Sequence, residues 1–163
     1  MSHLVHHLLQ ESAQRCGEAI ALTQDGRNLA YAELDALAGR VATGLLRRRV
    51  CCRARGAFYR DKRFETVAVA FGTARAGAVF VPVNPLLRAE QVAHILRDCN
   101  VRALVTSAER LGAIAPAIAQ CPDLRHVVHL GQVDAAIGDA RLVAFDEFAA
   151  EHGGSEHRVI DTD

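Results

Sequence analysis

Apolar side chains recur at helical spacing in several stretches of the chain. The stretch 32–48 carries them at offsets 0, 3, 4, 7 and 11, in Leu34, Leu37, Ala38, Val41 and Leu45. These offsets place all five on one face of a helix. The stretch 63–76 is apolar almost all round, so we expect a buried helix that ends at Gly77. Similar stripes predict helices at 3–15, at 88–99 and after Ser107, whose hydroxyl is expected to cap that helix.

Short strands are predicted between these helices. Asp25-Gly26, the preferred dipeptide of a tight hairpin turn, separates two of them. Further strands are expected at Val79–Val81, Ala103–Thr106, 125–130 and 141–145, and Asp146 is expected to cap a last short helix. This alternation predicts an α/β fold, a layered and mostly parallel sheet with helices on both faces. We expect Val79–Val81 and Ala103–Thr106 among its central strands.

Two prolines close together interrupt the segment 76–87, AGAVFVPVNPLL. Pro82 and Pro85 lack an amide donor and push the preceding residue toward extended geometry. The strand is therefore expected to stop near Val81 and to leave as a stiff loop. Such a loop lies at the carboxyl end of a strand, where open α/β sheets bind ligands. The loop at Val83-Asn84-Pro85 has either a structural role or a role in shaping a channel for a substrate or coenzyme.

Size and charge limit the function classes. A chain of 163 residues is expected to form one domain, and its 19 basic and 19 acidic residues balance. This balance argues against nucleic acid or an anionic membrane as a partner. No apolar run approaches the roughly 20 residues that span a bilayer. The first 16 residues lack a cationic region and a cleavage site, so we expect no membrane span and a cytoplasmic location.

The cysteines and histidines do not form a recognisable metal or disulfide pattern. The five cysteines, Cys16, Cys51, Cys52, Cys99 and Cys121, contain no CxxC pair and favour reduced, packed thiols. His3 and His7 could share one helix face with His6 between them, but no carboxylate or thiolate stands at matching spacing. We expect them to be ordinary residues of an amphipathic first helix.

Several ordered segments carry a family resemblance. They are LAYAEL (29–34), FGTARAGAVFVPVNP (71–85), QVAHILRDC (91–99) and RALVTS (102–107). Together they resemble the N-terminal part of AMP-forming acyl-CoA ligases of the adenylate-forming superfamily. The segments DKRFETV (61–67) and HILRDCNVRALVTSAERL (94–111) are most similar to acyl-CoA ligases associated with exosortase A systems. The resemblance covers residues 3–163, and none of these segments is catalytic.

The resemblance implies a two-step reaction. A small-molecule carboxylate attacks the α-phosphate of ATP, and CoA then displaces AMP from the acyl-adenylate. The family supplies a Gly-rich phosphate loop, an aromatic–Thr–Glu motif, a ribose-binding Asp and a C-terminal Lys, together with Mg²⁺. None of these motifs is in this sequence, so no catalytic, cofactor-binding or metal residue is assigned. We expect residues 1–152 to form the N-terminal subdomain and 153–163 to be a loop leading toward the phosphate-loop region.

Lys62 is the only lysine and the one candidate for a phosphate or CoA contact. It lies in DKRFE (61–65), where charges alternate in sign as they do at exposed helix starts. A solvated charge at the start of a helix is therefore the favoured interpretation.

The segment 47–60 departs from the family. A relative carries a turn resembling Gly-Val-x-Pro-Gly-x-Arg-Val there, whereas residues 47–55 of this chain include five arginines: Arg47, Arg48, Arg49, Arg53 and Arg55. GC-rich codons for residues 49–56, read in another frame, give Gly-Val-Leu-Pro-Gly-Ala-Arg. A local frame shift is one hypothesis, and genuine divergence and a functional basic patch are the others. If it is a frame-shift scar, its side chains are expected to fit no buried turn and the segment to be mobile and easily proteolysed.

Two function classes follow. The first is an N-terminal fragment of an acid–CoA ligase, inactive alone, whose partner is the remainder of the ligase chain. The second is a non-catalytic interaction or scaffold module derived from the ligase subdomain. The DNA downstream of Asp163 distinguishes them, because a continuation encoding a Ser/Gly/Thr-Lys-Gly loop supports the first.

Overall fold

The chain folds as a parallel sheet between two layers of helices. The computed structural model describes residues 4–60, 63–133 and 136–150. The helices are α1 (Val5–Cys16), α2 (Tyr31–Arg47), α3 (Phe64–Arg75), α4 (Ala89–Asp98), α5 (Ala108–Ile118) and α6 (Phe145–Ala150). The strands are β1 (Ile20–Gln24), β2 (Arg27–Ala30), β3 (Arg55–Tyr59), β4 (Val79–Val83), β5 (Val101–Ser107), β6 (His126–Leu130) and β7 (Arg141–Ala144).

The main sheet has the strand order β4-β3-β5-β6-β7, and every pair in it is parallel. The chain moves from β3 outward to β4 and then returns to β5 on the other side of β3. The order in which strands are added to the sheet therefore reverses between β3 and β5. The predicted α/β fold is confirmed, and β5 is an inner strand. The prediction for Val79–Val81 is wrong in position, because β4 lies at the edge of the sheet.

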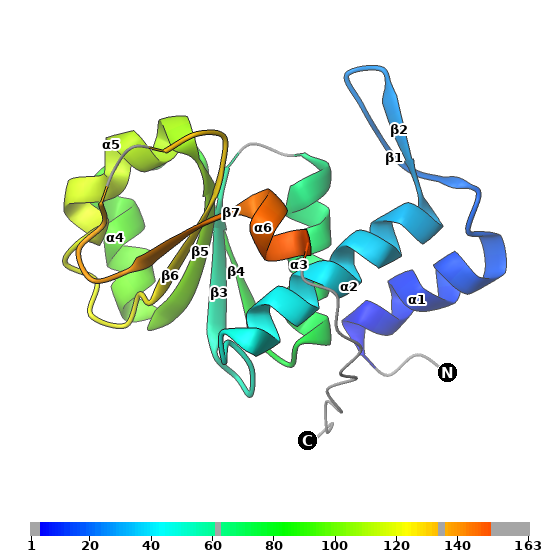
Figure 1. The fold of residues 1–163 in the computed structure, drawn as a ribbon, viewed down its shortest axis with the longest axis horizontal. Coiled ribbons are helices and arrows are strands. Elements are labelled where there is room, and N and C mark those ends of the chain that lie inside the picture. Colours follow the sequence, from blue (N-terminus) through cyan, green and yellow to red (C-terminus); the bar gives the residue numbers. More distant parts are fainter. Residues whose placement is uncertain (1–3, 61–62, 134–135, 151–163) are drawn as a thin grey trace.

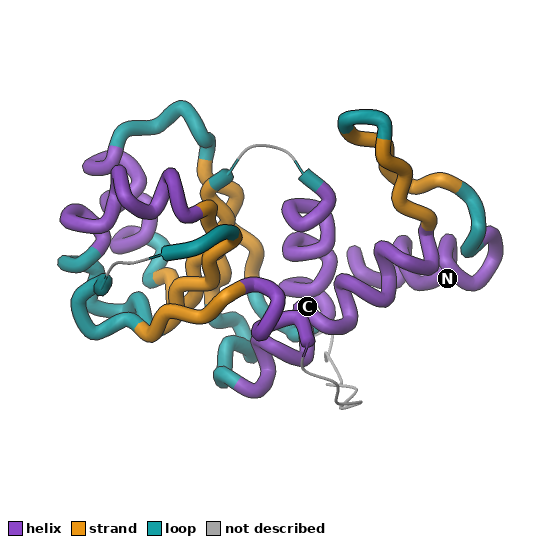
Figure 2. Tube along the Cα trace, turned by 45° about the horizontal axis from the view of Figure 1, so that its top comes forward, coloured by secondary structure: helices purple, strands orange, loops and turns teal. Residues whose placement is uncertain are grey.

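Figure 1 shows α4 and α5 on one face of this sheet and α2, α3 and α6 on the other. One core cluster joins α4 and α5 to the sheet through residues such as Leu96, Leu111 and Leu104. The second joins α2, α3 and α6 through residues such as Val41 and Phe148. The β1–β2 hairpin stands apart, beyond α1 and α2, in both views (Figures 1 and 2). The helices thus cover both faces, as predicted.

Two glycines allow the helices of the second layer to approach closely. A Cβ on Gly72 of α3 would lie 2.7 Å from the Val41 side chain and from the Ala38 carbonyl oxygen of α2. A Cβ on Gly44 of α2 would lie 2.7 Å from the carbonyl oxygen of Phe148 in α6. Real Cβ atoms do not make such contacts, so glycine at both sites fixes the distance between these helices.

The expected strand stop at Val81 is wrong, because β4 continues to Val83. Pro82 is opposite Phe58 in the β3–β4 pair, and β4 has no second neighbour in the sheet. An edge strand tolerates proline because its missing amide donor can be on the side away from the partner strand. The exposure of Pro82 agrees with this position.

Helix and turn signals were mostly correct. Asp25 and Gly26 both have positive φ, 50° and 73°, and join β1 to β2 as a hairpin. Ser107 caps α5, with its Oγ accepting from the Arg110 amide at 3.4 Å. α3 ends at Arg75 with Ala76 as its C-cap, and Gly77 follows with a φ of 72°, close to the predicted helix end. Asp146 does not precede the last helix, because α6 begins at Phe145 and holds Asp146 in its first turn.

The basic segment after α2 forms a strained turn and then an inner strand. Arg49, Cys52 and Arg53 adopt φ values of 57°, 52° and 70°, a region that favours glycine. The hypothetical other-frame sequence places glycine at positions 49 and 53, which agrees with two of these angles. It places proline at position 52, where a φ of 52° is incompatible with a pyrrolidine ring.

The same segment also fits the core better than a frame-shift scar would. Val50 is 1% exposed, and residues 56–59 of β3 are buried between β4 and β5. The expectation that the side chains fit no buried turn is therefore wrong for Val50. The poor fit is confined to the backbone of positions 49, 52 and 53.

His6 lies buried where α1 meets the second layer. Its side chain is 8% exposed, and its ring lies edge-on to His7, with centroids 4.5 Å apart. Burial lowers the pKa of His6 to about 4, and the nearby His7 and Arg75 lower it further. As the pH falls, this imidazole therefore takes up its proton at a higher pH in the unfolded chain than in the folded chain.

We predict that Arg49→Gly and Arg53→Gly each stabilise the protein by about 0.5–1 kcal/mol. Relief of a left-handed non-glycine residue contributes about 1–2 kcal/mol, and the added freedom of glycine in the unfolded chain costs about 0.5–1 kcal/mol. Urea denaturation measures the change. Arg55→Gly removes a neighbouring exposed charge at a residue without positive φ and should lower stability.

The frame-shift hypothesis predicts a further result. Replacing 49–55 by Gly-Val-Leu-Pro-Gly-Ala-Arg should raise the melting temperature, whereas Cys52→Pro alone should lower it because of the positive φ. An unchanged or lower melting temperature for the full replacement would favour a chain adapted to its arginines.

We predict that His6 makes stability fall as the pH drops from about 6.5 toward 4. The folded-state pKa lies below the ordinary value of 6.5, so within this window the unfolded chain binds the extra proton. The loss reaches about 2 kcal/mol at pH 5. His6→Gln should reduce this slope in urea denaturation at several pH values, and the exposed His94→Gln is the control. An unchanged slope in His6→Gln would contradict the assignment.

Candidate functional site

The carboxyl ends of all five parallel strands meet at one edge of the sheet. Tyr59, Val83, Ser107, Leu130 and Ala144 end β3, β4, β5, β6 and β7. The order in which successive strands are added reverses between β3 and β5. Ligands of open α/β sheets bind in the crevice outside the carboxyl ends of the strands at such a point. A ligand site of this fold is therefore expected at this edge.

The loop after β4 is tied to this edge by two side chains. The Tyr59 hydroxyl donates to the Leu87 carbonyl at 2.8 Å, and Arg110 Nη1 donates to the Pro85 carbonyl at 2.6 Å. The Arg110 guanidinium also stacks over the Tyr59 ring, 5.2 Å from its centroid. These contacts occupy Arg110 with the loop and favour a structural role for the loop over the channel role.

Two further hydrogen bonds stiffen the same region. Asn84 Oδ1 accepts from the Leu86 amide at 2.9 Å, which closes a local turn. The Thr106 hydroxyl, fully buried, donates to the Tyr59 carbonyl at 2.7 Å. Sequence reasoning missed Tyr59, Thr106 and Arg110, because their partners are 25 to 47 residues away along the chain. Nothing in the local pattern signals such contacts.

A cavity of about 340 Å³ opens beside the ends of β6 and β7. Its lining comes from the two strand ends and the start of α6: His129, Leu130, Gly131, Gln132, Ala144, Phe145 and Asp146. Both strands were predicted, so the rule about carboxyl ends points to these residues from sequence alone.

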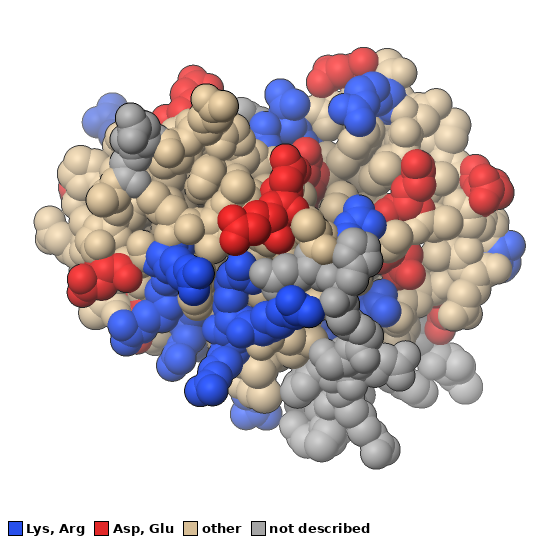
Figure 3. Space-filling model, in the orientation of Figure 1, with Lys and Arg blue, Asp and Glu red and all other residues tan. Residues whose placement is uncertain are grey.

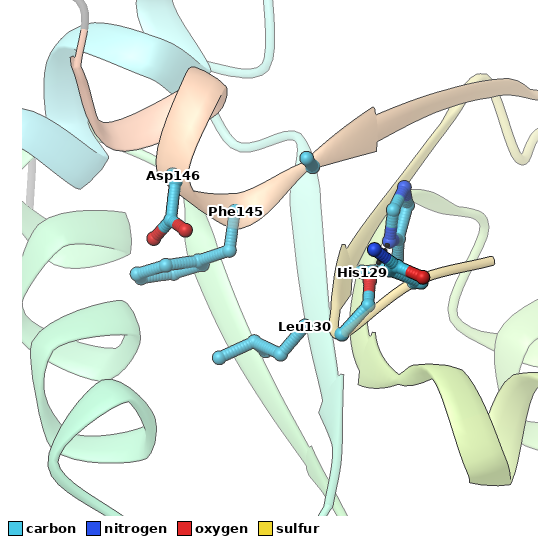
Figure 4. Close-up of a pocket in the computed structure, with 7 residues that line it drawn as sticks. His129, Leu130, Phe145 and Asp146 are labelled. Atoms are coloured by element: carbon cyan, nitrogen blue, oxygen red, sulfur yellow. Dashed lines mark hydrogen bonds between the residues drawn. The ribbon is translucent and has the colours of Figure 1, made fainter.

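Figure 4 shows how the polar groups of this cavity are arranged. His129 lies on the β6 side, whereas Asp146 lies on α6, across the cavity, beside the Phe145 ring. His129 Nδ1 lies 2.8 Å from the Gly131 carbonyl oxygen, so this nitrogen carries the proton and donates. In a neutral imidazole with this tautomer the other ring nitrogen is an acceptor. Gly131 turns the chain with a φ of 89°.

The chemistry available in the cavity is limited. Its lining contains one carboxylate, one imidazole and one amide beside apolar side chains, and no lysine or arginine. Binding a triphosphate needs cationic side chains or a cluster of backbone donors aimed at the phosphates. The cavity instead suits a small, mostly apolar group that offers a hydrogen bond to His129 or Gln132.

The other candidates from the sequence lie elsewhere or outside the described residues. Lys62 and His3 fall in segments that the structure does not describe, as do residues 153–163. His7 is half-buried on α1, and within 4–60, 63–133 and 136–150 no three His, Cys, Asp or Glu side chains are grouped to hold a metal. No described helix is long and apolar enough to cross a membrane.

The cysteines are free thiols in the structure. Burial raises the pKa of the Cys121 thiol, and burial together with a hydrogen bond to Cys52 raises the pKa of Cys51. A raised pKa keeps a thiol protonated and weakly nucleophilic. These two thiols are therefore poor nucleophiles, which agrees with a packing role.

The chain is similar in sequence to parts of large synthases. It is 30% identical over 111 residues to syringomycin synthase SyrB1 of Pseudomonas syringae pv. syringae, which covers 68% of this chain and 18% of that protein. It is 32% identical over 98 residues to surfactin synthase subunit 2 of Bacillus subtilis (strain 168), which covers 60% of this chain and 3% of that protein. The chain thus spans less than a fifth of either relative.

The fold is shared with solved ligases. The anthranilate CoA ligase AuaEII, in complex with anthranoyl-AMP, matches with a TM-score of 0.83 and 23% identity over 91% of this chain and 28% of that chain. The coronafacic acid ligase from Pectobacterium brasiliense matches with a TM-score of 0.84 and 22% identity, over 95% and 31%.

A family model settles the relationship. The model described as "AMP-binding enzyme" matches residues 9–157, which is most of the chain and includes every element from α2 to α6. The protein belongs to the AMP-binding enzyme family.

Proposed function

We propose that this chain is the N-terminal part of an AMP-forming acid–CoA ligase and is inactive alone. The observation that supports this proposal is that the chain is much shorter than the ligases that share its fold. The family match fills residues 9–157, yet the chain covers 28% and 31% of two ligases with the same fold. In this proposal the remainder of the ligase chain supplies the phosphate loop, the ribose-binding Asp and the catalytic Lys. ATP, Mg²⁺ and CoA act there, and a small-molecule carboxylate is the substrate.

The described residues support this division of labour. The cavity beside the ends of β6 and β7 lacks cationic groups, and Arg110 is held by the loop after β4. A tightly packed subdomain with little chemistry of its own suits a scaffold that positions a site built by later segments. CoA as the acceptor and the exosortase-associated subfamily are parts of the proposal that rest on the sequence resemblance. The cytoplasmic location is also part of the proposal and rests on the charge and apolar pattern of the sequence.

The alternative is a non-catalytic interaction or scaffold module that reuses the ligase subdomain. The two proposals differ in what the chain does when the missing part is supplied. A chimera tests this directly: the chain replaces the matching N-terminal part of the anthranilate CoA ligase AuaEII. ATP–pyrophosphate exchange with anthranilate would support the ligase proposal. A folded chimera that binds anthranoyl-AMP but does not exchange would favour the scaffold module.

We predict that the purified chain of 163 residues releases no pyrophosphate from ATP with any fatty or aryl acid, with or without CoA. Removing one preorganised donor for a developing charge commonly costs about 10²–10³ in rate. This sequence contains none of the phosphate loop, the aromatic–Thr–Glu motif, the ribose-binding Asp and the catalytic Lys of the family. The measurement is ATP–pyrophosphate exchange against a no-enzyme background. Exchange that Lys62→Ala abolishes would place the active site within this chain and overturn the proposal.

A further inference from the structure

Arginines gather at the amino edge of the sheet, opposite the edge described above. Arg102 lies at the start of β5, Arg125 directly precedes β6 and Arg141 opens β7, and all three are exposed. The Arg125 amide donates to the Arg102 carbonyl at 3.0 Å, and the Arg141 amide donates to the Arg125 carbonyl at 2.8 Å. The three residues therefore stand on neighbouring strands, about 4.8 Å from one strand to the next.

A bulge presents the first of these arginines. In the β3–β5 pair, Arg55 is opposite Val101, but the next residue, Gly56, is opposite Ala103. Arg102 is thus left without a partner on β3. Bulges are uncommon between parallel strands, and they re-aim a side chain. Here the bulge lies at the one position of the inner strand β5 that carries an exposed charge.

The turn after α2 extends this row of charge. We define the amino-edge arginine patch as Arg49, Arg53, Arg55, Arg102, Arg125 and Arg141, all of them exposed. Figure 3 shows basic side chains gathered on this face, below the acidic group at the centre of the view and over the end of α2 and the start of β7 in Figure 1. The chain as a whole carries equal numbers of acidic and basic residues, so its charge is segregated.

The patch lacks internal compensation at its centre. The side chains of Arg102, Arg125 and Arg141 make no hydrogen bond or ion pair with 4–60, 63–133 or 136–150. Asp123 is close in sequence to Arg125, but its carboxylate accepts from Asn100 Nδ2 at 3.0 Å.

A half-buried histidine beside the patch is affected by the same positive charge. His126 is opposite Arg141 in the β6–β7 pair. Burial lowers the pKa of His126, and the charges of Arg48 and Arg141 lower it further. Three guanidinium groups on adjacent strands repel one another, and an anion that bridges them would remove that cost.

We propose that the amino-edge arginine patch binds linear inorganic polyphosphate. Guanidinium groups pair with phosphate oxygens in a bidentate manner, and a row of them matches a row of phosphates. Single-stranded nucleic acid is the less favoured occupant, because its binding sites combine basic grooves with aromatic platforms, and no Phe, Tyr or Trp adjoins any of the six arginines in sequence. An acidic peptide offers carboxylates at lower linear density.

The test measures binding of short-chain polyphosphate to the full chain by fluorescence anisotropy at several salt concentrations. The triple variant Arg102→Gln/Arg125→Gln/Arg141→Gln should bind at least tenfold more weakly. The slope of log affinity against log salt should fall by about 2, because three phosphate contacts are lost. Circular dichroism and thermal melting check that the variant is folded.

The matched control is Arg15→Gln/Arg27→Gln/Arg88→Gln, which removes three exposed arginines from α1, the hairpin and the start of α4. It should bind polyphosphate as the parent chain does. An equal loss in both triples, or no binding by the parent chain, would overturn the patch. Oligothymidylate or polyglutamate of equal charge binding as tightly would overturn polyphosphate as its ligand.

Discussion

The burial of β3 on both faces of the sheet is the constraint on which the rest of the structure depends. Ala57 and Tyr59 pack into the cluster under α4 and α5, while Phe58 packs into the cluster under α2, α3 and α6. β4 pairs with no other strand, and β5 pairs with β3 over the whole length of β3. Removing β3 would separate the edge strand from the sheet and open both cores. Hydrophobic burial here therefore joins the two layers into one domain.

The inner strand β3 is also the element that the sequence pattern did not predict. The stretch 55–59 is short, contains glycine and follows a run with four arginines, so neither alternation nor β-branched residues mark it. The helices were predictable to within one or two residues, because stripes such as that of α2 are long and capped by recognisable signals. The strand order could not be predicted in the same way. Placing β4 at the edge depends on partners that are distant in sequence, and Pro82 was the only local sign of it.

The same limit applies to the candidate site. His129 and Asp146 could be anticipated, since each lies at or just beyond the end of a predicted strand. The contacts of Tyr59 and Arg110 with the loop at 85–87 could not, because they join β3, α5 and the loop only after the sheet has formed. Lys62, the one residue that sequence reasoning singled out for phosphate, lies outside the described residues and stays a prediction. A structural loop and a functional loop look alike in sequence when proline stiffens both.

The two edges of the sheet differ in how their charges are used, and this difference follows from the topology. At the carboxyl edge, Arg110 donates to the Pro85 carbonyl oxygen and stacks over the Tyr59 ring. Its guanidinium group therefore holds the loop after β4 in place. At the amino edge, the arginines project from strand starts, and Arg102, Arg125 and Arg141 have no such partners among the described residues. Ligands of parallel sheets usually bind at the carboxyl ends of the strands. Arginines at the amino ends can therefore be present without affecting the residues of such a ligand site. Under the two proposals made above, later segments of a ligase would complete the carboxyl edge, and the amino edge would bind its ligand independently of them.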